Sequence, residues 1–153
     1  MHWLSNKVLA RKIRDNATQE TLNAFHGIYS IDELPNHIPF RPFLIIVNTH
    51  TKNLPGEHWI AIFIDKNRHG EIFDSLALPV CHLLIQWMNM FTLKWNTNKR
   101  TLQHPLSSTC GAFTLYFILN RLHVANLDSV TATFDSNLAV NERILEIFYV
   151  SLK

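Results

Sequence analysis

The sequence predicts an α+β fold in which a small, mostly antiparallel sheet packs on helices. Apolar residues recur at helical spacing near both ends of the chain, whereas the middle holds one continuous and one alternating apolar run, which are typical of strands. The resulting order is helix, strands, helix, strand and helices, which suits a sheet covered by helices. Because the chain has 153 residues and no repeat or Gly/Ser linker, we expect one domain over residues 1–153.

Helical patterns account for most of the chain outside the central strands. Residues 4–14 predict an amphipathic helix, and Asn16 is expected to cap a second helix that runs to Phe25. Residues 30–33 fit another capping box. Three longer helices are expected further on, from Pro79 to about Phe91, from Cys110 to Leu122, and from Leu138 to Leu152.

The strands are expected in the middle of the chain. Phe43 to Asn48 is a continuous apolar run and suits a buried strand. Residues 59–65 alternate, residues 66–70 form a polar turn that ends in glycine, and residues 71–74 return, so this stretch predicts a hairpin. Residues 100–103 predict one more short strand.

The composition favours a folded protein of a reducing compartment. Hydrophobic residues make up 47% of the chain and charged residues 17%, which excludes global disorder. Only two cysteines are present, so the chain is not a disulfide scaffold and an intracellular location is expected. Basic residues interrupt the N-terminal apolar residues and no apolar run reaches bilayer length, so no secretion signal or membrane partner is expected. The nine histidines show no metal-ligand spacing, so no metal site is expected.

Cys110 is the candidate nucleophile. It is expected at the N-terminus of a helix, where free N–H groups and the helix dipole favour a thiolate. Small residues precede it and Gly111 follows it, so a substrate backbone could approach the sulfur closely. A structural cysteine at a helix start is the simpler explanation when this residue is considered alone.

Three further residues complete a catalytic set. His58 lies at the start of a predicted strand, and Asp74 lies near the same end of the paired return strand, where its carboxylate could orient the imidazole. Gln103 stands seven residues before Cys110, and its amide could donate to an oxyanion together with the Cys110 backbone N–H. Each residue has an ordinary structural explanation, and only the ordered set favours catalysis.

Motifs around these residues carry a family resemblance. The segments GEHWIAIFID, EIFDSLA and TLQHPLSSTCGAFTLYFIL, together with FHGIY and LIIVNT upstream, resemble adenovirus proteases (adenain) and, more broadly, the cysteine proteases that process SUMO and related proteins. The resemblance covers about residues 25–121. It implies an α+β fold with the cysteine on a central helix, and a thiol protease without a required cofactor.

The resemblance also implies a role for each residue. His58 would be the catalytic histidine, Asp74 the acid, Gln103 the oxyanion donor and Cys110 the nucleophile, while Trp59 and Gly111 would line the substrate cleft. Cleavage after small residues, often Gly-Gly or Gly-x, is implied, in the processing of a viral or mobile-element precursor. DNA or an activating peptide as cofactor, a monomeric state, and a place in the host nucleus or virion follow from the same resemblance.

The chain departs from each of the two branches of the family at one position. Adenovirus proteases usually carry Glu where this chain has Asp74, and SUMO proteases usually have Asp before the cysteine where this chain has Thr109. Cys81 lies in the interval that holds the activating-peptide cysteine of adenovirus proteases, but it falls in a predicted helix, so we do not expect it to be equivalent. An adenovirus-like virus or a polinton-type element would fit this mixture.

Other functions compatible with the sequence remain open. The chain could remove SUMO or a ubiquitin-like tag, which a panel of fusion substrates would reveal. It could be an inactive protein- or DNA-binding module, in which case a thiol-directed peptide probe would not label Cys110. An acetyltransferase on the same scaffold would instead show labelling of Cys110 that depends on acetyl-CoA.

Overall fold

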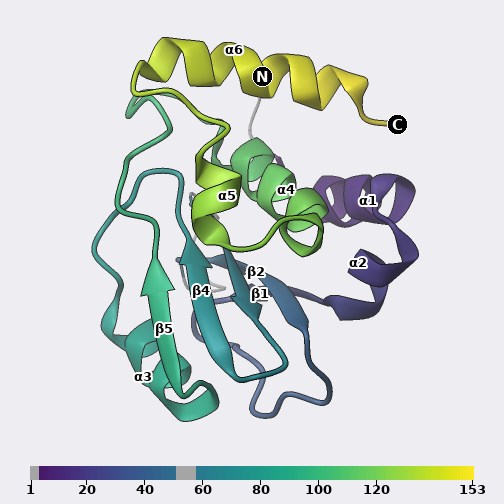
Figure 1. Ribbon diagram of the computed structural model, residues 1–153, viewed down its shortest axis with the longest axis vertical. Helices are drawn as coiled ribbons and strands as arrows, with labels where there is room; N and C mark the ends of the chain where they lie inside the picture. The colour runs from purple at the N-terminus through teal and green to yellow at the C-terminus, as the bar shows by residue number, and fades with distance from the viewer. Residues whose placement is uncertain (1–3, 51–57) are drawn as a thin grey trace.

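A five-stranded sheet with helices on both faces forms the framework of the computed structural model, which describes residues 4–50 and 58–153 (Figure 1). The elements in chain order are α1 (Asn6–Asn16), α2 (Gln19–Ala24), β1 (Phe25–Ser30), β2 (Phe43–Asn48), β3 (Trp59–Ile64), β4 (His69–Phe73), α3 (His82–Phe91), β5 (Lys94–Thr97), α4 (Cys110–Asn120), the 3-10 helix η1 (Arg121–His123), α5 (Leu127–Thr131) and α6 (Leu138–Ser151). The predicted α+β class is therefore confirmed.

The sheet is mixed and its strands follow in the order β1-β2-β3-β4-β5. The two inner pairings, β2–β3 and β3–β4, are antiparallel, whereas β1 pairs with β2 and β4 with β5 in parallel, so the sheet is evenly mixed and not mostly antiparallel as predicted. A tight hairpin can join only antiparallel strands, so each parallel edge needs a longer connection. Residues 31–42 supply it at one edge and α3 supplies it at the other.

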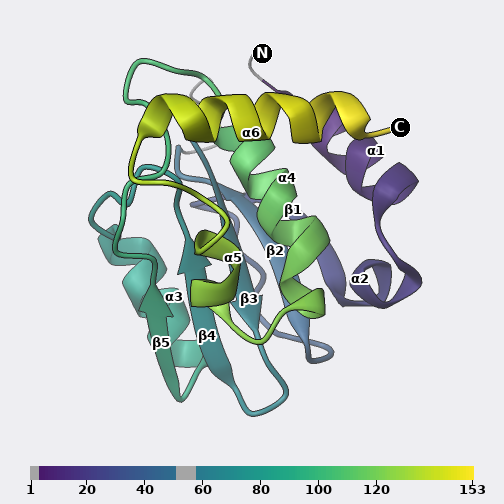
Figure 2. The ribbon, with the colours of Figure 1, turned by 45° about the horizontal axis from the view of Figure 1, so that its top comes forward.

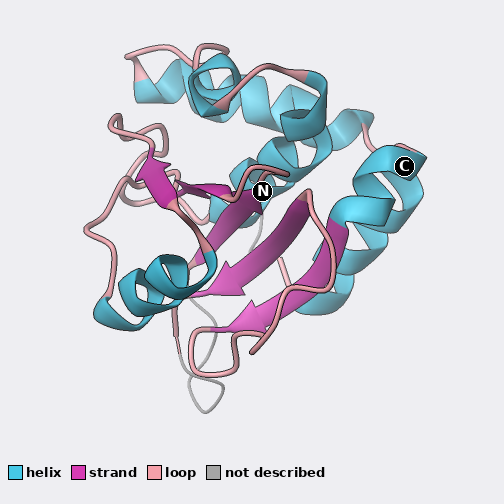
Figure 3. Cartoon of the chain, turned by 60° about the horizontal axis from the view of Figure 1, so that its bottom comes forward, coloured by secondary structure: helices cyan, strands magenta, loops and turns pink. Residues whose placement is uncertain are grey.

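Each face of the sheet buries its own apolar cluster, and Figure 3 shows helices on both faces. Alternate residues of β2 divide between the two clusters, because neighbouring side chains of a strand point to opposite faces. Leu44 and Ile46 join the cluster that contains α1, α4 and α6. Ile45 joins the cluster under α3, which includes Leu84. Burial of β2 on both faces explains its continuous apolar run.

Most of the long patterns predicted the right element. β2 occupies the predicted residues, and α1, α6 and the hairpin of β3 and β4 lie within two residues of their predicted bounds. The helix that begins at Cys110 is also present, although its last turn is a 3-10 helix. α3 ends at Phe91 as predicted, but it begins at His82 rather than at Pro79.

The predictions for residues 16–33 were partly wrong. Thr18, not Asn16, caps α2, and α2 ends at Ala24 because Phe25 begins β1. The Asn16 side chain instead bonds the chain end, accepting from the Lys153 N–H at 2.8 Å. Residues 30–33 form a turn closed by a hydrogen bond between Glu33 N and Ser30 O, rather than a helix start.

The predicted strand at residues 100–103 was also wrong, because β5 lies earlier, at Lys94–Thr97. The backbone N–H groups of Leu102 and Gln103 both donate to the Ser75 carbonyl, at 2.8 and 3.0 Å, within a loop. In the hairpin turn the residue with positive φ is Arg68, at 64°, while Gly70 lies inside β4. No helix of the described residues is long and apolar enough to cross a bilayer.

Candidate active site

The ends of two neighbouring strands and the beginning of one helix bring the candidate residues together. His58 directly precedes β3, Asp74 directly follows β4, and Cys110 is the first residue of α4. β3 and β4 are antiparallel, so the start of one lies beside the end of the other. α4 packs on β3 in the same apolar cluster. Gly56 and Glu57, which precede His58 in the sequence motif, lie outside the described residues.

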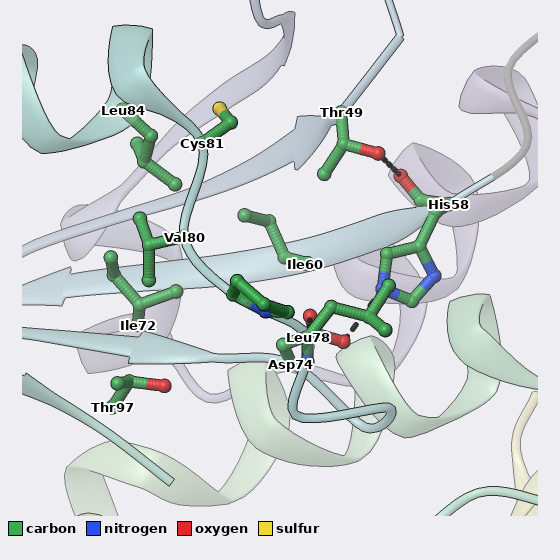
Figure 4. Close-up of a pocket in the computed structure, with 11 residues that line it drawn as sticks. Thr49, His58, Ile60, Ile72, Asp74, Leu78, Val80, Cys81, Leu84 and Thr97 are labelled. Atoms are coloured by element: carbon green, nitrogen blue, oxygen red, sulfur yellow. Dashed lines mark hydrogen bonds and ion pairs between the residues drawn. The ribbon is translucent and has the colours of Figure 1, made fainter.

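His58 and Asp74 form a close buried pair. His58 Nε2 lies 2.6 Å from Asp74 Oδ1, and the two residues are 8% and 7% exposed (Figure 4). Backbone N–H groups also donate to the same carboxylate, from Leu76 at 2.9 Å and from Leu78 at 3.2 Å. These contacts fix the position of the carboxylate, and the carboxylate in turn fixes the plane of the imidazole.

Cys110 also acts on the His58 ring, since it is one of the two residues that raise the pKa of His58. Because Asp74 takes Nε2, the ring nitrogen left for the sulfur is Nδ1. Burial by itself lowers the pKa of His58, but the hydrogen bonds and charges of Asp74 and Cys110 outweigh it and raise the pKa to about 9. At neutral pH the imidazole is therefore protonated between an oxygen and a sulfur, which is a suitable state for a general acid.

Gln103 lies in the loop before α4 and is 2% exposed. Its Oε1 accepts a hydrogen bond from Ser75 Oγ at 2.6 Å, and its Nε2 donates to the Ser107 carbonyl at 3.0 Å. These two contacts determine which way the amide faces, since its oxygen end meets a hydroxyl donor and its nitrogen end meets a carbonyl. The loop thus links Gln103 to the residue that follows Asp74 and to the segment that precedes Cys110.

Trp59 and Gly111, the two residues expected to line the cleft, lie close together, with Leu4 beside them. The Trp59 indole donates to the Leu4 carbonyl at 3.0 Å. A Cβ placed on Gly111 would lie 3.1 Å from Leu4 Cβ and 3.3 Å from Trp59 Cδ1. Glycine therefore permits the close approach of α4 to these two residues.

A cavity of about 180 Å³ borders the His58–Asp74 pair on the face of the sheet that packs against α3 (Figure 4). Its wall is mostly apolar and includes Ile60, Ile72 and Leu84. Cys81 also lines it, with a thiol that is exposed and free, whereas Cys110 is buried. Cys81 directly precedes α3 instead of lying inside it, because the helix begins at His82. The described residues contain no group of three or more His, Cys, Asp or Glu side chains placed to hold a metal ion.

Sequence reasoning missed two residues that hold this site. The Asn98 side chain accepts from the Asp74 N–H at 2.8 Å and donates to the Asp74 carbonyl at 2.7 Å. Ser75, described above, orients Gln103. Ser75 could have been suspected as a small polar residue next to the acid, but no local pattern marks Asn98, which lies 24 residues away from its partner.

Comparison with known proteins finds a relative in sequence and crystal structures with the same fold. No protein-family model matches the chain. The chain is 32% identical over 96 residues, 55% of its length, to the cysteine protease S273R of African swine fever virus, and it spans about a third, 35%, of that protein. A crystal structure of the African swine fever virus pS273R protease aligns over 88% of this chain and 63% of its own, with a TM-score of 0.61 and 19% identity.

The selenomethionine crystal structure of the same protease aligns over 62% of this chain and 39% of its own, with a TM-score of 0.51 and 24% identity. The sequence match supports the expected cysteine protease class, and the matched protease is that of African swine fever virus rather than an adenovirus protease. The chain is thus homologous, over 55% of its length, to a viral cysteine protease, and it shares the fold of that protein.

Proposed function

We propose that the chain is a cysteine endopeptidase in which Cys110 is the nucleophile, His58 transfers protons and Asp74 orients His58. The observation that carries the proposal is the buried His58 imidazole, which is hydrogen-bonded to Asp74 at 2.6 Å and whose pKa is raised by Asp74 and by Cys110, the first residue of α4. A base held by a third group and joined to a nucleophile is the arrangement that covalent catalysis requires. The homology to a viral cysteine protease supports the same class.

The proposed reaction is acyl transfer in two stages. The Cys110 thiolate attacks the peptide carbonyl, a C–S bond forms, and the carbonyl oxygen becomes an oxyanion. When the C–N bond breaks, His58 gives its proton to the leaving amine. His58 then takes a proton from water, whose oxygen attacks the thioester. When the C–S bond breaks, the carboxylic acid leaves, and the Cys110 thiolate and the protonated His58 are restored.

Gln103 is proposed as the side-chain donor to the oxyanion. Its amide nitrogen carries two hydrogens, and the contact with the Ser107 carbonyl uses one. The Ser107 carbonyl can only accept, so an exchange of the amide oxygen and the NH₂ group would place two oxygens against each other and lose this contact. The backbone N–H of Cys110, at the start of α4, is the proposed second donor.

Close packing near the sulfur supports a preference for small residues at the cleavage site. Cys110 is 2% exposed, and at the next residue even a methyl group on Gly111 would lie only 3.1 Å from Leu4 and 3.3 Å from Trp59. A substrate chain with little side-chain bulk would reach the sulfur with the least displacement of these residues. Peptides with Gly-Gly or Gly-x before the cleaved bond are therefore the proposed substrates.

Hydrolysis of a fluorogenic peptide panel by wild type, Cys110→Ala and Cys81→Ala tests the proposal. Cys81→Ala is the matched control, because it removes the other free thiol, which is exposed. We expect Cys110→Ala to abolish cleavage and Cys81→Ala to keep it within about twofold, since only the former removes the nucleophile. Equal hydrolysis by Cys110→Ala and wild type would exclude Cys110 as the nucleophile.

The same panel separates the two substrate classes. Peptides that end in Gly-Gly and intact SUMO or ubiquitin-like fusions are compared by kcat/KM. A preference for the short peptides supports precursor processing, whereas a large preference for the fusions would assign the chain to deconjugation, because recognition would then depend on the folded tag.

A further inference from the structure

The loop that leads into Cys110 is held from outside by α6. Glu142, on the first turns of α6, accepts three hydrogen bonds through Oε1: from the His104 N–H at 3.0 Å, from Ser107 Oγ at 2.8 Å and from Thr109 Oγ1 at 3.1 Å. The Ser107 and Thr109 hydroxyl oxygens also lie 2.8 Å apart, but each has a single hydrogen, so they do not bond each other while both donate to Glu142. Figure 2 shows α6 crossing α4 near the end where α4 begins. One carboxylate therefore ties the beginning, middle and end of the segment 104–109 to α6.

The contacts of Glu142 with His104, Ser107 and Thr109, called the Glu142 clamp below, affect the proposed oxyanion donors by two routes. The Ser107 carbonyl is the acceptor that positions the Gln103 amide, so fixing Ser107 also fixes Gln103. Thr109 is the residue before Cys110, so fixing Thr109 fixes the direction of the Cys110 N–H. Hydrogen bonds to a charged acceptor are stronger than those between neutral groups, and here one acceptor holds both routes.

Glu142 also takes the hydroxyl group of the N-cap residue of α4. Thr109 stands at the N-cap, where a threonine hydroxyl usually accepts from an N–H of the first turn. Here it makes no such capping hydrogen bond, and instead it donates to Glu142. The N–H groups of the first turn of α4 are thus not capped by this hydroxyl, and they lie next to Cys110, where negative charge would develop.

We propose that Glu142 is a positioning residue for the oxyanion-stabilising loop of this enzyme. It touches neither Cys110 nor His58 in any contact described here, and it acts through Ser107 and Thr109. The proposal rests on the proposed protease function and deepens it. It assigns to a residue of α6 the positioning of the two proposed oxyanion donors, the Gln103 amide and the Cys110 N–H. No pattern in the sequence links Glu142 to Thr109, 33 residues away.

The test compares Glu142→Ala and Glu142→Gln with Glu146→Ala, all in a Cys81→Ala background. Glu146 lies one turn further along α6, is exposed and pairs with Arg143, so its removal deletes a carboxylate from the same helix without touching the loop. Kinetics on a Gly-Gly peptide give kcat and KM, and iodoacetamide reports the reactivity of Cys110 in a reaction that forms no oxyanion. Losing an oxyanion donor costs about 100- to 1,000-fold in kcat, and a misplaced donor should cost less.

We expect Glu142→Ala to lower kcat by about 10- to 100-fold while KM and the alkylation rate stay within about threefold. Glu142→Gln, which retains an acceptor oxygen without the charge, should recover part of this loss. If Glu142→Ala matches Glu146→Ala in kcat, or if kcat and the alkylation rate fall together, the positioning role is overturned.

Hydrogen exchange of the backbone amides of residues 104–110 gives a readout that does not need turnover. We expect exchange at least about tenfold faster in Glu142→Ala and unchanged in Glu146→Ala, because the clamp protects this loop from local opening. Unchanged exchange in Glu142→Ala would overturn the inference even if the enzyme is active. If wild type cleaves no peptide but Glu142→Ala exchanges faster, the clamp stands and the proposed function fails.

Discussion

Replacing Asp74 with asparagine tests the electrostatic part of the site most directly. The substitution keeps the shape of the side chain but removes the charge that faces His58 at 2.6 Å. Asp74 Oδ1 also accepts from Leu76 N, and Oδ2 accepts from Leu78 N. An asparagine can offer only one oxygen to these donors, so either His58 or one backbone group loses its partner.

The magnitude follows from the type of contact that is lost. A hydrogen bond to a charged group contributes about 1.5–3 kcal/mol, which is roughly a 10- to 150-fold effect on turnover if the bond acts in the transition state. Asp74 makes the largest of the contributions that raise the pKa of His58 to about 9, whereas burial lowers this pKa. In Asp74→Asn the pKa of His58 should therefore fall well below 9. The loss should be smaller than for Cys110→Ala or His58→Ala, because Asp74 orients the base and does not react.

Two assays measure these effects. Hydrolysis of the Gly-Gly peptide between pH 5 and 10 gives kcat/KM, and an NMR titration of the histidine ring protons, with His58→Gln for assignment, gives the pKa of His58. Asp65→Asn is a matched control, since Asp65 lies 3.7 Å from another histidine, His69, outside the candidate site. Thermal unfolding shows whether each variant is folded.

The result that would refute the reasoning is specific. If folded Asp74→Asn keeps the kcat/KM of Asp65→Asn, and if the pKa of His58 stays near 9, then Asp74 does not control the imidazole. Cys110 would then account for the raised pKa by itself, and the assignment of Asp74 as the orienting acid would be wrong.

Three predictions concern stability. Gly70→Ala should destabilise the fold by about 1–3 kcal/mol in urea unfolding, because the added methyl would lie 2.7 Å from Cγ2 of the β-branched Thr92, besides 2.6 Å from Met88 Cε; an unchanged midpoint would mean that α3 shifts freely. Arg121→Ala should cost about 3–5 kcal/mol by the same measurement, because it strands the buried Glu71 carboxylate that Arg121 binds at 2.6 and 2.9 Å; a loss below 1 kcal/mol would contradict this. The pKa of His58 in the folded state, about 9, lies above its ordinary value of 6.5. Protonated His58 therefore contributes about 3 kcal/mol to the free energy of unfolding below pH 6.5, and this contribution is lost as the pH rises through 9. The free energy of unfolding measured across this range should fall in wild type and change less in His58→Gln.

The sequence determined the elements whose patterns are long or unambiguous. Cys110 begins a helix as predicted because the apolar run that follows has the length of a buried helix and small residues precede it. Phe43 to Asn48 is a strand because both its faces meet apolar neighbours. Short polar segments were not predictable in the same way, since a capping box at residues 30–33 can equally close a turn.

Tertiary contacts decided the segments that were predicted wrongly. Asn16 has the chemistry of a cap, but it binds the far end of the chain at Lys153, and no local pattern reports a partner that distant. Residues 100–103 have a strand-like composition, but their N–H groups bond the Ser75 carbonyl in a loop. The edge strand β5 is half exposed and only four residues long, so its periodicity is too short to read.

The sequence by itself supplied the types and the order of the candidate site residues, because His58, Asp74, Gln103 and Cys110 all stand in motifs with recognisable flanks. Only the tertiary structure decided how they are held: the 2.6 Å contact between His58 and Asp74, the amide of Gln103 oriented by Ser75, and the carboxylate of Glu142 on the loop. The physical reason is that a motif reflects local chain geometry, whereas the orientation of a polar group depends on hydrogen bonds to residues that only folding brings near.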